Sequence, residues 1–565
     1  MDSSSEGERR ATPRAAVRWL LTAWDKLAER RLGLWFFAGF LLIIALKVSA
    51  APHRAHRWVY DSFSLLDGGW RVLNGQRPHV DFFSGIGPAS YLVVALGMAL
   101  SRSAAAIDYG LASAAALFGI WAWLLFRNRL ERPAAVLLAL LVTMITCAPH
   151  TIGSRPDQLT DEGIYNRLGY AMIFLVTVEC LRPPRVSSPR SELAGGISTG
   201  AACLLPFFVK PSFFLEGVIL IAASLLFRDR RSLKRCLGLG IGLVGSTLAM
   251  LAYLRFDVVA VFQDLSTMTA ARMEVQAADP RVVIGPRLFL RGAYEDGPLL
   301  IVLLVLALLL SSLPRAPRVW KRVDAWWPLA AAAAIYTLDA GVRIGNGLQI
   351  TLPLVEVFGL LLACEMYAWW SRAPQPERQD NGFVCGVCLL LGLVMFLPEV
   401  GRDFSSLAYA ALEKARDQPV AARFEPAHLR ALVTLDPNPD WEEPANGKAL
   451  VDEINDGIDL LRRASPPTEK VMTVNYVNPF SFALLRRPAA GAGSFLSPGF
   501  FNERHSPPFE RMFGQADVMM MPKHPEPSGN TRFVMRVVRP WVEAHFHPAA
   551  ESADWILYRR NDLKP

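Results

Sequence analysis

Long apolar runs separated by short polar stretches fill most of the first 400 residues of the chain. A helix needs roughly 17 to 25 mostly apolar residues to cross a lipid bilayer. By that measure the pattern predicts about eleven transmembrane helices, at residues 33–50, 104–126, 134–148, 163–181, 193–209, 212–227, 236–255, 298–313, 325–340, 348–369 and 382–400. One further apolar stretch, residues 88–101, is short, and its length alone does not decide whether it crosses the membrane.

The basic residues between the runs decide this point. If residues 88–101 do not cross, five loops lie on the same side as the basic N-terminus and hold 17 lysines and arginines, against three in the short loops opposite. Cytoplasmic loops of membrane proteins carry an excess of Lys and Arg. The pattern therefore predicts a cytoplasmic N-terminus and a helix at residues 88–101 that lies along the outer surface. The five basic loops are residues 127–132, 182–190, 228–235, 314–322 and 371–378.

The last 165 residues are more polar and then fall outside the membrane. Helical periodicity at residues 451–464 and strand-like segments at residues 470–477, 517–523 and 555–560 predict mixed α/β structure there. The fold class expected is an all-α polytopic membrane protein with a C-terminal extracytoplasmic α/β domain. We expect residues 1–32 to form a cytoplasmic N-terminal segment and residues 33–400 a transmembrane domain with a first outer loop at 51–103. Residues 401–565 are expected to form the α/β domain.

Composition agrees with this class. Hydrophobic residues make up 52% of the 565 residues and the mean hydropathy is +0.26, too apolar for a soluble protein of this size. The net charge of +8 comes from basic clusters between apolar runs, where they set membrane orientation, so no nucleic-acid partner is expected. The seven cysteines lie in or beside apolar runs, which indicates neither a disulfide framework nor a zinc site.

The most informative stretch follows the first apolar run. Residues 58–91 place Asp61, Asp67 and Asp81 among aromatic residues and glycines just outside the membrane. Carboxylates there face water at little cost and can take a proton from a hydroxyl group, so the loop is a candidate site. The alternative is a solvated loop with no chemistry.

After the first apolar run the chain carries, in this order, Asp61, Leu73, Gly75, Pro78, His79, Asp81, Phe82, Gly87 and Pro88. This pattern resembles the first outer loop of the GT-C superfamily of polyprenyl-phosphate-sugar-dependent glycosyltransferases, which includes protein mannosyltransferases and lipid A aminoarabinose transferases. Many members have Asp-Glu where this chain has Asp61-Ser62, and Asp161-Glu162 in the next outer loop is a competing acidic pair. The resemblance implies a hexosyl- or pentosyltransferase of the bacterial inner membrane. Its donor would be a polyprenyl-phosphate-sugar and its acceptor a lipid or cell-envelope glycan.

The resemblance also implies roles for these residues. The leaving phosphate needs no strong general acid, so a single base suffices: Asp61 is assigned as the general base of an inverting transfer, and Asp81 as an orienting or sugar-binding carboxylate. Isolated cations at the outer membrane face are expected to bind the donor phosphate, although anchors that snorkel to the interface look the same in sequence. These cations are Lys210, Arg167 and Arg343, and the expected substrate-binding residues are Tyr165, Asn166 and His79.

No cofactor is required by these residues, and a divalent metal ion stays open as a partner of the acidic groups. His79, His150 and His505 are too scattered in sequence to indicate a metal site and are expected at the surface.

Two other functions remain open. A lipid or glycan transporter or flippase would use Glu216 and Glu356, which lie inside apolar runs, to line a pathway. A non-catalytic glycan-binding scaffold would not need Asp61.

Overall fold

The structure is a computed structural model. It describes most of the chain, namely residues 13–29, 32–56, 58–227, 232–278, 297–311, 333–340, 351–416, 422–433, 447–493, 495–524 and 529–562.

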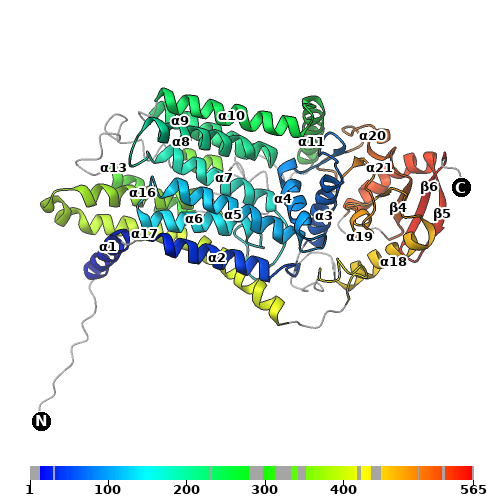
Figure 1. The fold of residues 1–565 in the computed structure, drawn as a ribbon, viewed down its shortest axis with the longest axis horizontal. Coiled ribbons are helices and arrows are strands. Elements are labelled where there is room, and N and C mark those ends of the chain that lie inside the picture. The colour runs from blue at the N-terminus through cyan, green and yellow to red at the C-terminus, as the bar shows by residue number, and fades with distance from the viewer. Residues whose placement is uncertain are drawn as a thin grey trace, which may run out of the picture.

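A bundle of helices forms the larger part of the molecule (Figure 1). Helices occupy the predicted apolar runs wherever these fall in the described residues; the run at 325–340 falls there only in part. Five described helices are long and apolar enough to cross a membrane, and five apolar helices are shorter. The bundle helices are α2 (Gly33–Ser49), α5 (Ala106–Phe126), α6 (Arg132–Cys147), α7 (Ile164–Leu181), α8 (Pro189–Leu204), α9 (Pro211–Phe227), α10 (Leu233–Tyr253), α13 (Gly297–Ser311), α16 (Pro353–Arg372) and α17 (Gln375–Ala415).

The packing of the bundle follows from side-chain size. Helix α7 is buried along almost its whole length and packs against α5, α6, α8, α9 and α16, so it lies at the centre. Helices α8 and α10 approach closely along four glycines: a Cβ atom on any of them would lie 2.2–2.5 Å from a backbone oxygen of the other helix. Only glycine allows this contact. The four glycines are Gly196, Gly200, Gly238 and Gly242.

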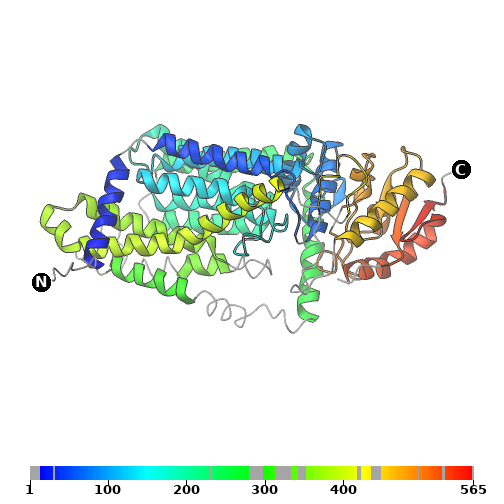
Figure 2. The same ribbon diagram turned by 90° about the horizontal axis from the view of Figure 1, so that it is seen from below.

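The two ends of the bundle differ. One end, made by residues 51–105, 149–163 and 205–211, adjoins the C-terminal sheet and is called the sheet end. It carries α3 (Val59–Leu73), α4 (Pro88–Leu100) and α11 (Val258–Ala278), and α11 runs across the bundle axis between the bundle and the C-terminal region (Figure 2). The amphipathic helix α1 (Pro13–Glu29) crosses the opposite end.

The C-terminal region contains a four-stranded sheet in the order β2-β4-β6-β5, with β2 and β4 parallel and the other pairs antiparallel. Strands β2, β4 and β6 fall within the three segments predicted as strands, and α18 covers the predicted helix. The elements are β2 (Val471–Thr473), β4 (Val518–Pro522), β5 (Phe546–Glu551), β6 (Trp555–Arg560), α18 (Lys448–Ala464), α19 (Phe480–Ala483), α20 (Phe509–Phe513) and α21 (Asn530–His545). Helix α17 continues to Ala415, so the boundary predicted at residue 400 falls inside a helix.

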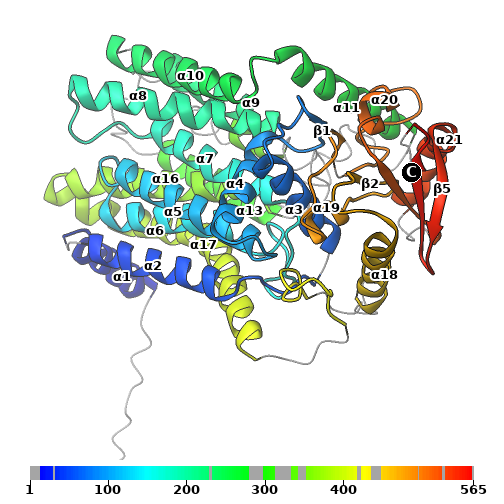
Figure 3. The same cartoon turned by 45° about the vertical axis from the view of Figure 1, so that its right-hand side comes forward.

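The C-terminal region is bound tightly to the first loop after α2. Strand β1 (Phe82–Phe83) pairs in parallel with β3 (Gly491–Ala492). Figure 3 shows β1 beside the C-terminal region. The Arg71 guanidinium is buried, donates to the Ala489 carbonyl at 2.6 Å and pairs with Asp67 at 2.8 Å. Asp67 therefore has a structural role, holding an arginine that joins the two parts of the chain.

Candidate functional site

Asp61 lies in the first turn of α3, at the sheet end of the bundle, and its side chain is half-buried. The next residue, Ser62, is fully buried and donates a hydrogen bond of 2.5 Å to Asp161. A carboxylate held at a fixed place next to a buried, hydrogen-bonded residue is suited to accept a proton from a bound hydroxyl group.

Tyr165 connects Asp61 with positively charged groups. Its phenol lies near enough to Asp61, Glu162 and Arg272 to interact with all three electrostatically. The Lys210 ammonium lies over its ring, with Nζ 5.7 Å from the ring centroid. At the sheet end, Tyr165 thus lies within electrostatic range of two carboxylates and one arginine, and the Lys210 ammonium lies over its ring.

Lys210 is placed by a tight backbone contact. It lies between the short 3₁₀ helix η1 (Leu205–Phe208) and α9, and its amide donates to the Pro206 carbonyl at 2.7 Å. A Cβ atom at Gly87 would lie 2.2 Å from the Phe208 carbonyl oxygen. The Gly87-Pro88 segment therefore supports the turn that carries Lys210, and only glycine permits this approach.

The charge state of Lys210 is sensitive to its surroundings. Burial and then the nearby positive charge of Arg272 lower the pKa of Lys210 to about 7, while Glu216 opposes the shift. No carboxylate of the described residues lies within salt-bridge distance of its ammonium. A desolvated lysine amine of this kind binds an incoming anion strongly once it is protonated.

Arg272 was not predicted from the sequence. It is an exposed residue of α11, and its charge acts on both Tyr165 and Lys210. Its one sequence signal is its position between the predicted transmembrane runs 236–255 and 298–313, on the side of the membrane opposite the basic loops, where Asp61 is also predicted to lie. Its proximity to Lys210 depends on how α11 crosses the end of the bundle, which no local pattern encodes.

Arg167 belongs to a different cluster. Its side chain is buried, pairs with Asp403 at 3.0 Å, and donates to the backbone carbonyls of His150 and Ile145. Its donors are thus engaged within the protein. The neighbouring Asn166 is buried, and its side-chain oxygen has no hydrogen-bond partner among the residues described.

His79 and Asp81 hold the first loop in place. His79 is buried, pairs with Asp264 of α11 at 3.2 Å, and its carbonyl accepts from Arg511 at 2.9 Å. The Asp81 carboxylate accepts from the Arg77 amide at 2.7 Å, and its backbone carbonyl accepts from Gly491. Arg343 lies outside the described residues.

Two of the three histidines expected at the surface are buried. His79 is 2% exposed and His150 is fully buried, and each binds a carboxylate brought from another helix, so that prediction was wrong for both. The described residues contain no group of three or more His, Cys, Asp and Glu side chains placed to hold a metal ion.

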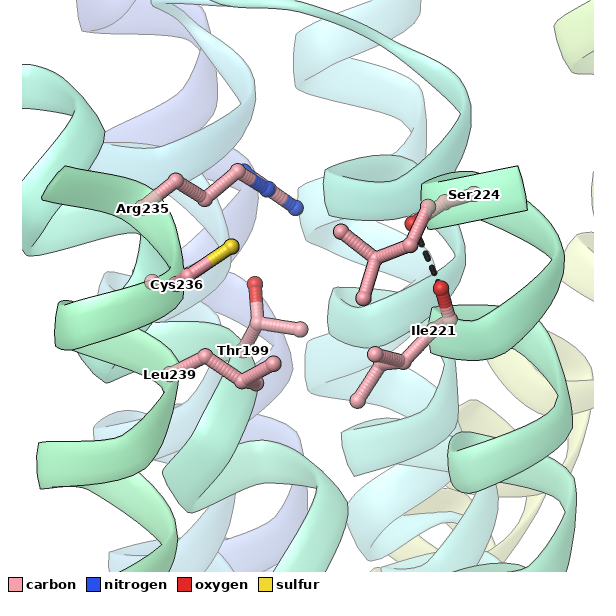
Figure 4. Close-up of a pocket in the computed structure, with 8 residues that line it drawn as sticks. Thr199, Ile221, Ser224, Arg235, Cys236 and Leu239 are labelled. Carbon is pink, nitrogen blue, oxygen red and sulfur yellow. Dashed lines mark hydrogen bonds between the residues drawn. The ribbon is translucent and has the colours of Figure 1, made fainter. Parts of the chain in front are cut away.

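A small pocket lies elsewhere in the bundle (Figure 4). It is lined by residues of α8, α9 and α10, among them Thr199, Ser224 and Arg235. Arg235 and Thr199 both bind Glu179, so these groups are paired within the bundle. Ser224 is near the far end of the helix that follows Lys210, which puts the pocket about 20 Å from the lysine along the helix axis.

Comparisons with known proteins give a distant structural likeness. A crystal structure of ArnT from Cupriavidus metallidurans in the apo state aligns with 93% of this chain and 97% of its own, at 13% sequence identity and a TM-score of 0.42. The same protein bound to undecaprenyl phosphate aligns with 94% and 98%, at 12% identity and a TM-score of 0.43. No family model and no curated protein matches the chain. Likeness at this level defines no residue correspondence.

Proposed function

We propose that this protein is a GT-C-type membrane glycosyltransferase. It transfers a sugar from a polyprenyl-phosphate-linked donor to a lipid or cell-envelope glycan acceptor at the outer face of the membrane. One observation carries the proposal: Asp61, Tyr165, Lys210 and Arg272 come from four separate parts of the chain and meet at one end of an apolar bundle. This combines a base with cations for a phosphate where a lipid-linked donor can reach both.

The chemistry assigns a step to each group. Asp61 takes the proton of the acceptor hydroxyl, and the acceptor oxygen attacks the anomeric carbon with inversion. The bond from that carbon to the phosphate oxygen breaks, and the polyprenyl phosphate leaves as an anion. Lys210 and Arg272 stabilise its charge in a partly desolvated site, where such interactions are stronger than in water.

The other predicted residues take supporting roles. Asp81 orients the loop that follows α3 through its bond to the Arg77 amide. The buried Asn166 oxygen accepts a hydrogen bond from substrate, since the described residues offer it none. Arg343 remains a candidate for a third phosphate-binding cation.

The proposal includes a topology. The protein crosses a bacterial inner membrane about eleven times, with a cytoplasmic N-terminus and an extracytoplasmic α/β domain. Helix α4 supports this arrangement because its 13 residues are fewer than a crossing needs. Helix α1 supports it too, because an amphipathic helix with basic residues suits the cytoplasmic membrane surface.

Lipid and glycan mass spectrometry of a deletion strain tests the function directly. We expect one sugar to be lost from an envelope lipid or glycan and the polyprenyl-phosphate-sugar to accumulate. Complementation with the wild-type chain should restore the sugar, and complementation with Asp61→Asn should not. An unchanged envelope together with normal donor levels would contradict the proposal.

A flippase is the second candidate, and one observation favours it. Glu216 is 2% exposed, and neither of its carboxylate oxygens has a hydrogen-bond partner within the described structure. Buried unpaired carboxylates often line transport pathways. Proteoliposomes loaded with a fluorescent polyprenyl phosphate separate the two functions: a flippase moves the lipid between leaflets without acceptor, and a transferase does not.

A further inference from the structure

A line of buried charged groups runs from the bundle toward the start of α3. Lys47, in the last turn of α2, pairs with Asp108 of α5 at 2.6 Å. His53 then binds the same carboxylate twice, through its ring Nδ1 at 2.9 Å and its backbone amide at 3.2 Å. All three side chains are at most 3% exposed. The first half of the line thus fixes His53 against two helices.

The other face of the His53 ring continues the line. Its Nε2 lies 3.5 Å from one oxygen of Asp161, whose second oxygen accepts the 2.5 Å hydrogen bond from Ser62. Ser62 directly follows Asp61 in the first turn of α3. The line therefore ends at the residue next to the proposed base, and Asp161 joins the loop 149–162 to that turn.

With both carboxylates of this line ionised, its charges balance only when His53 carries a proton. Lys47 and Asp108 form one pair, and Asp161 then requires a second cation, which a protonated His53 supplies. Burial alone would lower the pKa of His53, but Asp108 and Asp161 together more than offset that effect and raise it. A neutral His53 would leave a buried carboxylate without its charge partner, which is costly.

We propose that His53, Asp161 and Ser62 are positioning residues, which hold the first turn of α3 so that Asp61 faces the acceptor hydroxyl. This rests on the proposed function of Asp61. A positioned base is effective only within hydrogen-bonding reach of its proton, and a small displacement of the turn reduces turnover without affecting the phosphate-binding cations.

Few other charged groups of the neighbouring elements could affect the protonation of His53. The charged groups that face His53 are Lys47 from α2, Asp108 from α5 and Asp161 from the loop. From α17, the Lys414 ammonium reaches only the Pro52 carbonyl, at 3.5 Å. The protonation of His53 is thus governed by the line itself.

The test measures kcat and donor KM separately in proteoliposomes, for each variant that remains folded. Ser62→Ala and His53→Gln should lower kcat about ten- to a hundredfold, the equivalent of losing one hydrogen bond to a charged group. Donor KM should stay within about twofold, because Lys210 and Arg272 are untouched. Asp161→Asn keeps an acceptor for Ser62 and should retain more activity than Asp161→Ala.

His56→Gln is the matched control, because His56 lies in the same loop but pairs with Glu413 of α17, outside the line. Its kcat should equal that of the wild type. The pH profile is measured in the Lys210→Arg background, where the cation at position 210 does not titrate in this range. At saturating donor, kcat in this background should fall as the pH rises and His53 loses its proton, and this decline should disappear when His53→Gln is added. Histidine-labelled protein studied by NMR should show a protonated His53 at pH 7 in the wild type and a smaller protonated fraction in Asp161→Asn.

Normal kcat in folded Ser62→Ala, with Asp61→Asn inactive, would overturn the positioning role while leaving the base assignment intact. A neutral His53 at pH 6 would overturn it as well. Full activity of Asp61→Asn would instead remove the proposed base. The NMR result does not depend on activity, so the two failures can be told apart.

Discussion

Replacing Lys210 by methionine should weaken donor binding in a pH-dependent way. Methionine keeps much of the length and apolar volume of the lysine stem but has no charge. The ammonium lies over Tyr165 without a carboxylate partner among the described residues, so a donor phosphate would be its main ionic partner. A hydrogen bond to a charged group contributes about 1.5 to 3 kcal/mol, which corresponds to roughly ten- to a hundredfold in affinity.

The direction of the pH effect follows from the pKa of Lys210, which burial lowers to about 7. Only the protonated amine attracts the phosphate, so wild-type affinity should be highest below pH 6. It should fall as the pH rises through 7, by about tenfold per unit of pH, until it reaches the affinity of Lys210→Met. Lys210→Arg keeps its charge throughout this range and should bind the donor with little pH dependence.

The assay is equilibrium binding of a polyprenyl-phosphate-sugar in nanodiscs from pH 5.5 to 9. A phosphodiester donor is essential, because a phosphate monoester changes its own charge with a pKa of about 6. Equal affinities of the wild type and Lys210→Met across this range would refute the reasoning. So would an affinity of the wild type that rises with pH.

Three further predictions concern the base, the second cation and the topology. Asp61→Asn should bind donor normally but lower the rate of transfer about a hundred- to ten-thousandfold, measured in proteoliposomes. Arg272→Ala should raise donor KM and leave the melting temperature unchanged. As a contrast, Arg167→Ala breaks a buried ion pair with Asp403 and should lower the free energy of unfolding, measured by denaturation, by about 3 to 5 kcal/mol. A reporter fused after Arg102 should report the outer compartment and one fused after Arg132 the cytoplasm; the reverse result would remove the outer-face site.

Local patterns predicted the elements of the fold well. Within the described residues, the long apolar runs are helical, and the short strand-like segments at 470–477, 517–523 and 555–560 contain strands β2, β4 and β6. These predictions succeeded because helices and strands depend on the periodicity of neighbouring residues. The pairing of β1 with β3 joins residues about 400 positions apart, and periodicity contains no information about such pairs.

The candidate site was predictable only in part. Asp61 and Lys210 could be found because each is a charged residue beside an apolar run. Arg272 could not be found, because its role depends on the path of α11 across the bundle. Arg167 looked like an equally good phosphate ligand in sequence, but its partner Asp403 lies 236 residues away. A charge at a membrane face therefore becomes informative only once its partner is known.

The pairing of β1 with β3 also sets the order of events during biosynthesis. The ribosome makes Phe82 early, but the Gly491 that pairs with it emerges about 400 residues later, after roughly 20 to 80 seconds of synthesis. Until then the loop that contains Gly87, and with it the support for the Lys210 turn, lacks its strand partner. A chain that stalls before residue 491 would have made its bundle helices, yet α3, which carries Asp61, would lack the bond from Arg71 to Ala489, and the Gly87 loop would lack its strand partner. The last part of the chain to be made is thus needed to complete the proposed site in the first part.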